Sequence, residues 1–368
     1  MGRIRSMTDK DKTGEMLTEN RYESLHEDWR PLIRFTGAGS AYFGLLFKTF
    51  IFSLLTLGIY SFWGRTLQRQ YLWGNTLLLD EPLEYTGTGK ELFISFLIVV
   101  PVFLILVLAF GFAAAALGPL GWIGLYFPLV FLWQFATYRA LRFRLTRTRW
   151  RGIRGNMGGN AILYGAMAAG YLFLAIISLG LLYPWASGKM ADYVLNNAWF
   201  GNRKLAFSGS IRRLYKTYLL GLLGGLIATT LLFGLAYSLL SANLGDLSAF
   251  SRIAAIVFFI FLIFSVCSAF YRAAFFRWLF EQAGFGHMRT RSTLSGGRML
   301  YLTLTNLALI ACTLGLRTAW AVIRAARTRL NSILYQGDPH LDELLQDTQK
   351  APKSGEGLLD ALDVNISL

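Results

Sequence analysis

The sequence predicts an all-α integral membrane protein, a multi-pass helical bundle with internal repeats and short cytoplasmic β-hairpins between its membrane segments. Three observations support this fold class. The chain of 368 residues is 54% hydrophobic and only 15% charged, whereas about a quarter of the residues in soluble domains are charged. Its apolar residues form long uncharged blocks, and one short motif occurs three times along the chain.

The uncharged blocks are long enough to cross a bilayer. They cover residues 92–138, 217–245 and 253–271. Because about 20 helical residues cross the hydrocarbon core, the first block predicts two spans and each of the others predicts one. The first thirty residues are polar and lack the pattern of a removable signal peptide. We therefore expect the first membrane segment to direct insertion.

Positive charge gathers beside the blocks, while the two ends of the chain are acidic. Of the 21 acidic residues, seven precede Trp29 and seven follow Gly337, whereas most of the 36 basic residues flank the apolar blocks. Since basic flanks usually face the cytoplasm, we expect the basic loops and both termini on the cytoplasmic side of a bacterial inner membrane. The expected partners are the lipid bilayer, anionic lipid head groups and another membrane protein. Nucleic acid is not an expected partner, because these arginines line membrane ends rather than a soluble recognition module.

The repeated motif is Thr/Ser-Leu-Gly-Ile/Leu, followed by three residues and a tryptophan. Its copies begin at Thr56, Ser178 and Thr313. We call the segment that carries each copy an opener, because it begins a repeat. The motif residues expected to act in packing or at the membrane interface are Gly58, Trp63, Gly180, Trp185, Gly315 and Trp320.

The repeats divide the chain into five parts. These are a polar tail (1–34), membrane repeat 1 (35–157), membrane repeat 2 (158–291), a partial membrane repeat 3 (292–337) and an acidic tail expected to be disordered (338–368).

Several strings resemble the YjgN-like family of bacterial inner-membrane proteins, a family defined by a domain of unknown function. The strings that carry the resemblance are Phe35–Gly39, Tyr42–Gly44, Thr56–Trp63, Leu83–Gly87 and Phe207–Gly209. The third opener departs from the pattern, because Arg317 follows its Leu-Gly-Leu string where the other copies have an apolar or aromatic residue. The resemblance implies a location and a topology class, and it brings no catalytic residues.

Basic residues flank the openers on both sides, which leaves two topologies open. In the first opener, the apolar run from Thr49 to Trp63 is shorter than a comfortable span. We therefore favour re-entrant openers, which dip into the membrane, turn near the Leu-Gly pair and return. The alternative is seven complete spans with an inverted middle repeat, as in many transporters. The uncharged run 155–188 favours this alternative.

The sequence predicts no enzyme, cofactor or metal site. The three histidines, His26, His287 and His340, stand alone, whereas metal sites need clustered ligands. Cys267 and Cys312 lie far apart in apolar stretches, which argues against a disulfide framework. The chain also lacks an evident pairing of acid, base and nucleophile.

Charged residues in or beside the apolar segments are the remaining candidate site residues. Lys48 and Asp192 are candidates for charges inside the membrane, and Glu91 is a further candidate partner of Lys48. The simpler interpretation is that Lys48 snorkels to the head groups. The candidate lipid-binding arginines alternate with other residues, a pattern that suits a strand or an interfacial ribbon; they are Arg142, Arg144, Arg147, Arg149 and Arg151.

Two functions fit these observations. A membrane scaffold or regulator that binds lipid or a partner is favoured by spans without polar residues and by the one-sided basic charge. A small-solute transporter or channel, with its site between the repeats, is favoured by the duplication itself. A water-accessible cavity lined by Lys48, Asp192 or the opener glycines would support transport.

Overall fold

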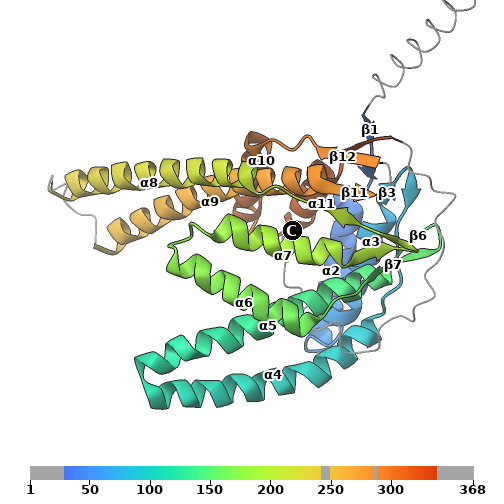
Figure 1. Cartoon of the computed structure of the whole chain (residues 1–368), viewed down its shortest axis with the longest axis horizontal. Coiled ribbons are helices and arrows are strands. Elements are labelled where there is room, and N and C mark those ends of the chain that lie inside the picture. The colour runs from blue at the N-terminus through green and yellow to red at the C-terminus, as the bar shows by residue number, and fades with distance from the viewer. Residues whose placement is uncertain (1–28, 242–248, 286–287, 338–368) are drawn as a thin grey trace, which may run out of the picture.

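The computed structural model describes residues 29–241, 249–285 and 288–337. The expected disordered tail and most of the polar tail lie outside these residues. In the described part, the helices extend to one side of the molecule and the strands gather on the other (Figure 1). We call the second side the strand side.

The helices form two kinds of pairs. The openers are pairs of short helices: α2 (Gly39–Leu55) with α3 (Ser61–Gly74), α6 (Ala161–Ile177) with α7 (Tyr183–Asn196), and α10 (Gly296–Cys312) with α11 (Thr318–Leu330). Two long hairpins alternate with them: α4 (Gly89–Leu117) with α5 (Pro119–Arg147), and α8 (Arg212–Ser241) with α9 (Ala249–Gln282). Gly118, with φ 60°, makes the turn before Pro119 at the first position of α5, where proline is favoured.

The expected all-α fold is wrong, because thirteen strands in the described part of the chain form three antiparallel sheets. The strands are β1 (Arg30–Pro31), β2 (Ile33–Phe35), β3 (Thr76–Leu78), β4 (Glu81–Pro82), β5 (Glu84–Tyr85), β6 (Thr148–Trp150), β7 (Ile153–Met157), β8 (Ala198–Phe200), β9 (Arg203–Lys204), β10 (Ala206–Phe207), β11 (Ala283–Phe285), β12 (Met288–Ser292) and β13 (Ile333–Gln336). The sheets have the orders β1-β13-β12-β11-β10, β2-β3-β4 and β5-β6-β7-β8-β9. Connecting segments meet on the strand side, where pairing satisfies their backbone donors and acceptors.

The expected multi-pass bundle also fails on its number of spans. Among the described residues, two helical segments are long and apolar enough to cross a membrane, Arg212–Leu231 in α8 and Ile263–Gln282 in α9. Only 6% and 22% of their windows are buried. Few residues of these segments are therefore buried, unlike those of a core helix in a soluble domain. Shorter apolar helical segments are Gly39–Leu55, Phe103–Leu117 and Ala161–Ile177.

Each opener reverses direction at its Leu-Gly pair. The leucines Leu57, Leu179 and Leu314 have φ between 47° and 51°, and the glycines that follow them have φ between 87° and 92°. The amide of each glycine donates to the carbonyl five residues earlier, over 2.7 to 2.9 Å. This bond closes the first helix of the opener with a left-handed cap. At the tips, the leucine side chains are 90 to 95% exposed.

The helices form a closed ring. Each helix from α2 to α10 packs against the next one along the chain, and α11 packs against α2. The strands β3, β8 and β13 each follow the second helix of an opener. β3 pairs with β4 and β8 pairs with β9, and in the same position β13 pairs with β1 from the other end of the chain. Asn331 Oδ1 accepts a hydrogen bond from the Phe35 amide at 2.7 Å, and Arg327 donates to the Gly37 carbonyl, also at 2.7 Å. Residues 30–37 thus complete the sheet and the loop beside the third opener.

We predict that Gly58→Leu destabilises the protein through backbone strain alone. No atom lies within 4 Å of a Cβ at position 58, so steric conflict does not contribute. The φ of 92° at Gly58 is unfavourable for leucine, and such strain costs about 1–2 kcal/mol. The matched control is Gly44→Leu in α2, where a Cβ also has open space and φ is not left-handed. The midpoint of thermal unfolding in detergent should fall for Gly58→Leu only, and equal midpoints would refute the strained turn.

Candidate membrane interface

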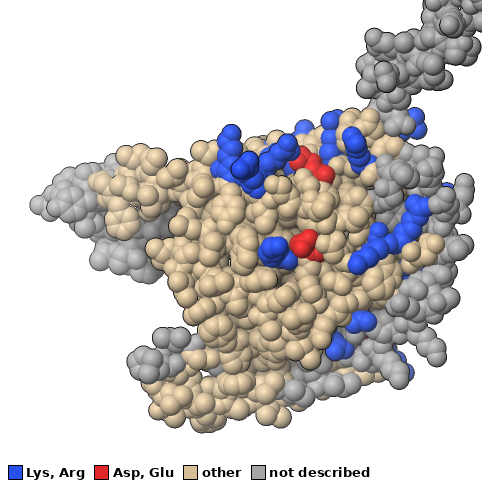
Figure 2. Space-filling model, viewed as in Figure 1, with Lys and Arg blue, Asp and Glu red and all other residues tan. Residues whose placement is uncertain are grey.

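Basic side chains are concentrated toward the strand side of the molecule. In Figure 2, Lys and Arg side chains lie over the middle of the visible face and over the strand side, whereas the described part of the free ends of the long hairpins shows none. Large apolar side chains are exposed along the helices, including Phe50, Leu104 and Leu220. This division between an apolar part and a basic edge is the pattern of a protein that meets both hydrocarbon and anionic head groups.

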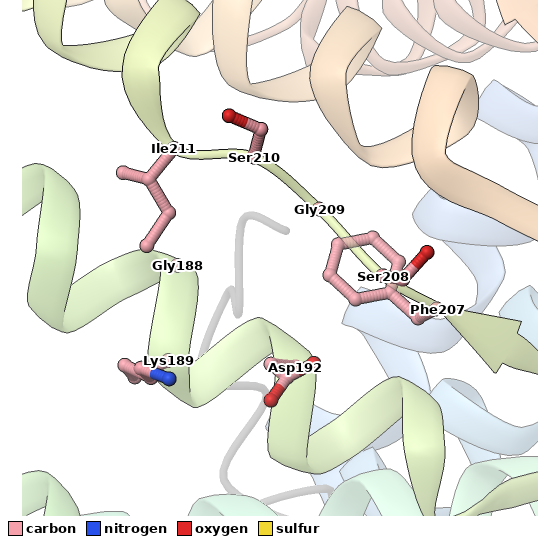
Figure 3. A pocket seen from close by; sticks show the side chains of 8 residues that line it. All are labelled: Gly188, Lys189, Asp192, Phe207, Ser208, Gly209, Ser210 and Ile211. Atoms are coloured by element: carbon pink, nitrogen blue, oxygen red, sulfur yellow. The ribbon is translucent and has the colours of Figure 1, made fainter.

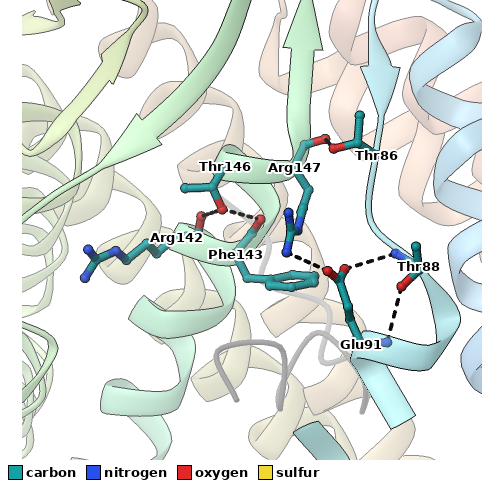
Figure 4. Close-up of polar contacts among 7 residues, drawn as sticks. All are labelled: Thr86, Thr88, Glu91, Arg142, Phe143, Thr146 and Arg147. Carbon is teal, nitrogen blue, oxygen red and sulfur yellow. Dashed lines mark hydrogen bonds and ion pairs between the residues drawn. The ribbon is translucent and has the colours of Figure 1, made fainter. Parts of the chain in front are cut away.

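An ion pair closes the base of the first long hairpin (Figure 4). Arg147 at the end of α5 donates to Glu91 Oε1 at the start of α4, over 2.6 Å. Thr88 and Glu91 form a capping box, in which the Thr88 amide donates to Glu91 Oε2 at 3.2 Å and the Glu91 amide donates to Thr88 Oγ1 at 3.3 Å. Glu91 therefore caps α4 and also holds the last turn of α5 against it.

The second long hairpin has an ion pair at its base with the charges exchanged. Arg213 at the start of α8 lies 3.1 Å from Glu281 at the end of α9. Arg213 follows Glu91 by 122 residues, the offset between the first two openers, and Glu281 follows Arg147 by 134. These four charged residues are visible in the sequence. They can be recognised as corresponding pairs only when the two hairpins are aligned and a residue of opposite charge is accepted at each aligned position.

The predicted arginine ribbon is a strand only in part. Arg142, Arg144 and Arg147 lie in α5, which extends to residue 147. Arg149 lies in β6 opposite Glu84, and Arg151 in the following turn pairs with Glu81 at 2.7 Å. The hydrogen bond from Arg151 lowers the pKa of the Glu81 carboxyl. Arg147 and Arg151 thus contact carboxylates of their own chain.

The motif tryptophans lie beside other elements. The Trp63 ring contacts the start of α4, where a Cβ at Gly89 would meet it at 2.7 Å. The Trp320 ring likewise contacts the start of α2, where a Cβ at Gly39 would lie 2.5 Å from the ring. Trp185 packs edge-on against Tyr171, with ring centroids 4.7 Å apart. The motif glycines Gly58, Gly180 and Gly315 lie in the three tip turns.

The structure separates the two charges that were predicted inside the membrane. Lys48 is exposed on α2, and Glu91, its suggested partner, binds Arg147. Asp192 lies near the strand-side end of α7, in an open pocket of about 450 Å³ between α7 and the loop that precedes α8 (Figure 3). Lys189 and Asn196, which sequence reasoning missed, complete this arrangement with Asp192.

The comparisons with known proteins agree with the predicted family. A family model described as "Bacterial protein of unknown function (DUF898)" matches residues 30–361. The inner membrane protein YjgN of Salmonella typhimurium (strain LT2) is 23% identical over 382 residues, covering 91% of this chain and 96% of that protein. No solved structure matches the chain.

We predict that Arg147→Glu destabilises the protein and that Glu91→Arg in the same chain restores much of the loss. Reversal of one charge leaves two carboxylates in contact at a site where both side chains are less than one-third exposed. Loss of such a charge-assisted hydrogen bond costs about 2 kcal/mol. The exchanged pair reproduces the arrangement of Arg213 and Glu281.

The measurement is thermal unfolding in detergent of both single variants and of the double variant. Arg298→Glu, which reverses an exposed charge at the start of α10, is the control for net charge and should unfold near the wild-type midpoint. If the effects of the two single changes merely add, the ion pair does not stabilise the hairpin base.

Proposed function

The chain belongs to the DUF898 family of bacterial proteins, and we propose that it is an inner-membrane scaffold whose openers dip into one leaflet while its basic strand side binds anionic head groups. One observation carries this proposal. Three leucines are almost fully exposed at the opener tips, and both ends of every opener return to the strand side. A bare leucine tip is costly in water and favourable in hydrocarbon.

The lengths of the helices support re-entrant openers. The first helix of each opener has 17 residues, which corresponds to about 25 Å at 1.5 Å per residue. The hydrocarbon core is about 30 Å thick. An opener whose ends lie among the head groups therefore reaches into the hydrocarbon and turns back before crossing it.

The second long hairpin is the proposed crossing element. α8 and α9 have 30 and 34 residues and contain the two segments that are apolar enough to cross. In this proposal, this hairpin crosses and returns, and the strand side with its basic residues faces the cytoplasm.

We also propose that the chain contains three tandem units. The tip geometry shared by the openers and the exchanged ion pairs of the hairpins support this duplication. The third unit, which the sequence alone presents as partial, obtains its missing strand and loop from residues 30–37 at the other end of the chain.

Transport is the alternative function, and the position of the charged residues argues against it. The Asp192 pocket lies near the strand-side end of α7, and its lining includes neither Lys48 nor a glycine of the three Leu-Gly turns. A carboxylate at that level suits head groups better than a path through the membrane. A scaffold that binds lipid head groups therefore explains the position of these charged residues better than a transporter does.

We predict that spin labels at positions 57, 179 and 314 lie in hydrocarbon. Each leucine is changed to cysteine in a chain without Cys267 and Cys312, and the labelled protein is placed in bilayers. Electron paramagnetic resonance should show high accessibility to oxygen and low accessibility to a water-soluble nickel complex at all three tips. A label at Asn75, on the strand side, is the control and should show the reverse.

The topologies give different results. In the seven-span alternative, the tip turns are still within the bilayer, but the label at Asn75 lies across the membrane from one at Arg203. In a soluble arrangement, the nickel complex reaches all the tips. Water-accessible tips would overturn the proposed insertion of the openers.

A further inference from the structure

We propose that the pocket between α7 and residues 207–211 binds the head group of a phospholipid that carries both a phosphate and a primary ammonium. The inference rests on the proposed function, in which the strand side lies at head-group level. It adds the site and the chemical class of the lipid.

The pocket presents one cation and one anion that are not paired with each other. Lys189 and Asp192 line its α7 wall, and Phe207, Ser208, Ser210 and Ile211 line the opposite wall (Figure 3). Among the described residues, no ion pair joins Lys189 to Asp192. Lys189 is exposed and Asp192 is half-buried. Both charges are therefore open to a ligand that enters from the surface.

Asn196 fixes the geometry of the anionic side. Its amide nitrogen donates to Asp192 Oδ1 at 2.8 Å and to the Phe207 carbonyl at 3.2 Å, and its amide oxygen accepts from the Phe207 amide at 3.1 Å. One side chain thus orients the carboxylate and also ties the loop to α7. The second carboxylate oxygen of Asp192 is not used in these contacts.

Trp278 in α9 holds the other end of the loop. Its indole nitrogen donates to the Ser210 carbonyl at 2.9 Å. A Cβ at Gly209 would lie 2.5 Å from the Trp278 ring and 3.0 Å from the Phe207 ring. The loop is consequently fixed at both ends and forms a preformed wall of the pocket, with the Ser208 and Ser210 hydroxyls pointing away from Lys189 and Asp192 (Figure 3).

The spacing of the charges fits a phosphoethanolamine group. Residues three apart on a helix lie on the same face, with Cβ atoms about 5–6 Å apart. In the ligand, an oxygen and two carbons separate the phosphorus from the nitrogen. The phosphate accepts a hydrogen bond from Lys189 Nζ, and the ammonium donates to Asp192. A purely anionic head group meets repulsion from Asp192, and a quaternary ammonium has no N–H to donate.

The other openers lack this pair of charges. In the third opener, the matched positions 135 residues later are Arg324 and Arg327, and Arg327 donates to the Gly37 carbonyl. In the first opener, the positions 122 residues earlier are Leu67 and Gln70. The pocket is therefore a feature of the second opener and not a general consequence of the turn geometry.

Native mass spectrometry of the full chain, purified in detergent and stripped of lipid, tests the proposal. The probes are an ethanolamine, a choline and a glycerol phospholipid with identical acyl chains. We expect the ethanolamine lipid to bind about tenfold more tightly than the choline lipid, since a charge-assisted hydrogen bond distinguishes them. Asp192→Asn, which preserves shape, should abolish this preference, and Lys189→Gln should weaken all three lipids.

Lys204→Gln, on β9 outside the pocket, is the matched control and should bind as the wild type does. Soluble phosphoethanolamine should compete with the ethanolamine lipid more strongly than inorganic phosphate does, which separates the zwitterion from a simple anion. Equal binding of the ethanolamine and choline lipids, or an unchanged preference in Asp192→Asn, would overturn this inference. Spin labels at the opener tips would in that case still report insertion into hydrocarbon. The proposed function and the proposed lipid site can therefore be refuted separately.

Discussion

The reversal of the chain at three Leu-Gly pairs is the constraint on which the rest of the structure depends. Each pair puts two successive residues at positive φ, and a hydrogen bond closes the helix that precedes them. Because each opener then returns beside its own start, the segments that connect the helices gather on one side. These segments form the three sheets, and the basic residues near them form one edge of the molecule.

Closure of the ring follows from the same constraint. The third opener ends where the first begins, so β13 pairs with β1 and α11 packs on α2. The buried aromatic rings of Phe35, Tyr85 and Phe207 end the strands β2, β5 and β10, which pack beside the three openers. The three openers and the two long hairpins therefore form a closed ring. The strands β1 and β2, near the start of the described chain, pack beside the third opener.

The sequence predicted those features that depend on local pattern. The apolar blocks indicated the long hairpins, and the repeated motif marked all three turns, since a Leu-Gly pair is itself the local cause of the reversal. Short β-hairpins were predicted but the sheets that join distant strands were not, because strands of two or three residues have too little pattern to specify distant partners such as Tyr85 with Thr148 or Arg30 with Tyr335. A similar ambiguity affected Arg142–Arg151, where the alternation also fits a helix with Phe143 and Thr146 buried on one face. Of the two charges that line the pocket, the sequence analysis named Asp192, as a candidate charge inside the membrane, and passed over Lys189.

Sidedness of the connecting segments tests the central claim most directly. Single cysteines replace Asn75, Arg203 and Ser241 in a chain without its native cysteines, and a membrane-impermeant thiol reagent is applied to intact cells and to inverted vesicles. If the openers return to the side they came from, positions 75 and 203 react from the cytoplasmic side, and position 241, at the end of α8, reacts from the periplasmic side. Labelling of 75 and 203 from opposite sides would contradict the account, because the second opener would then cross the membrane.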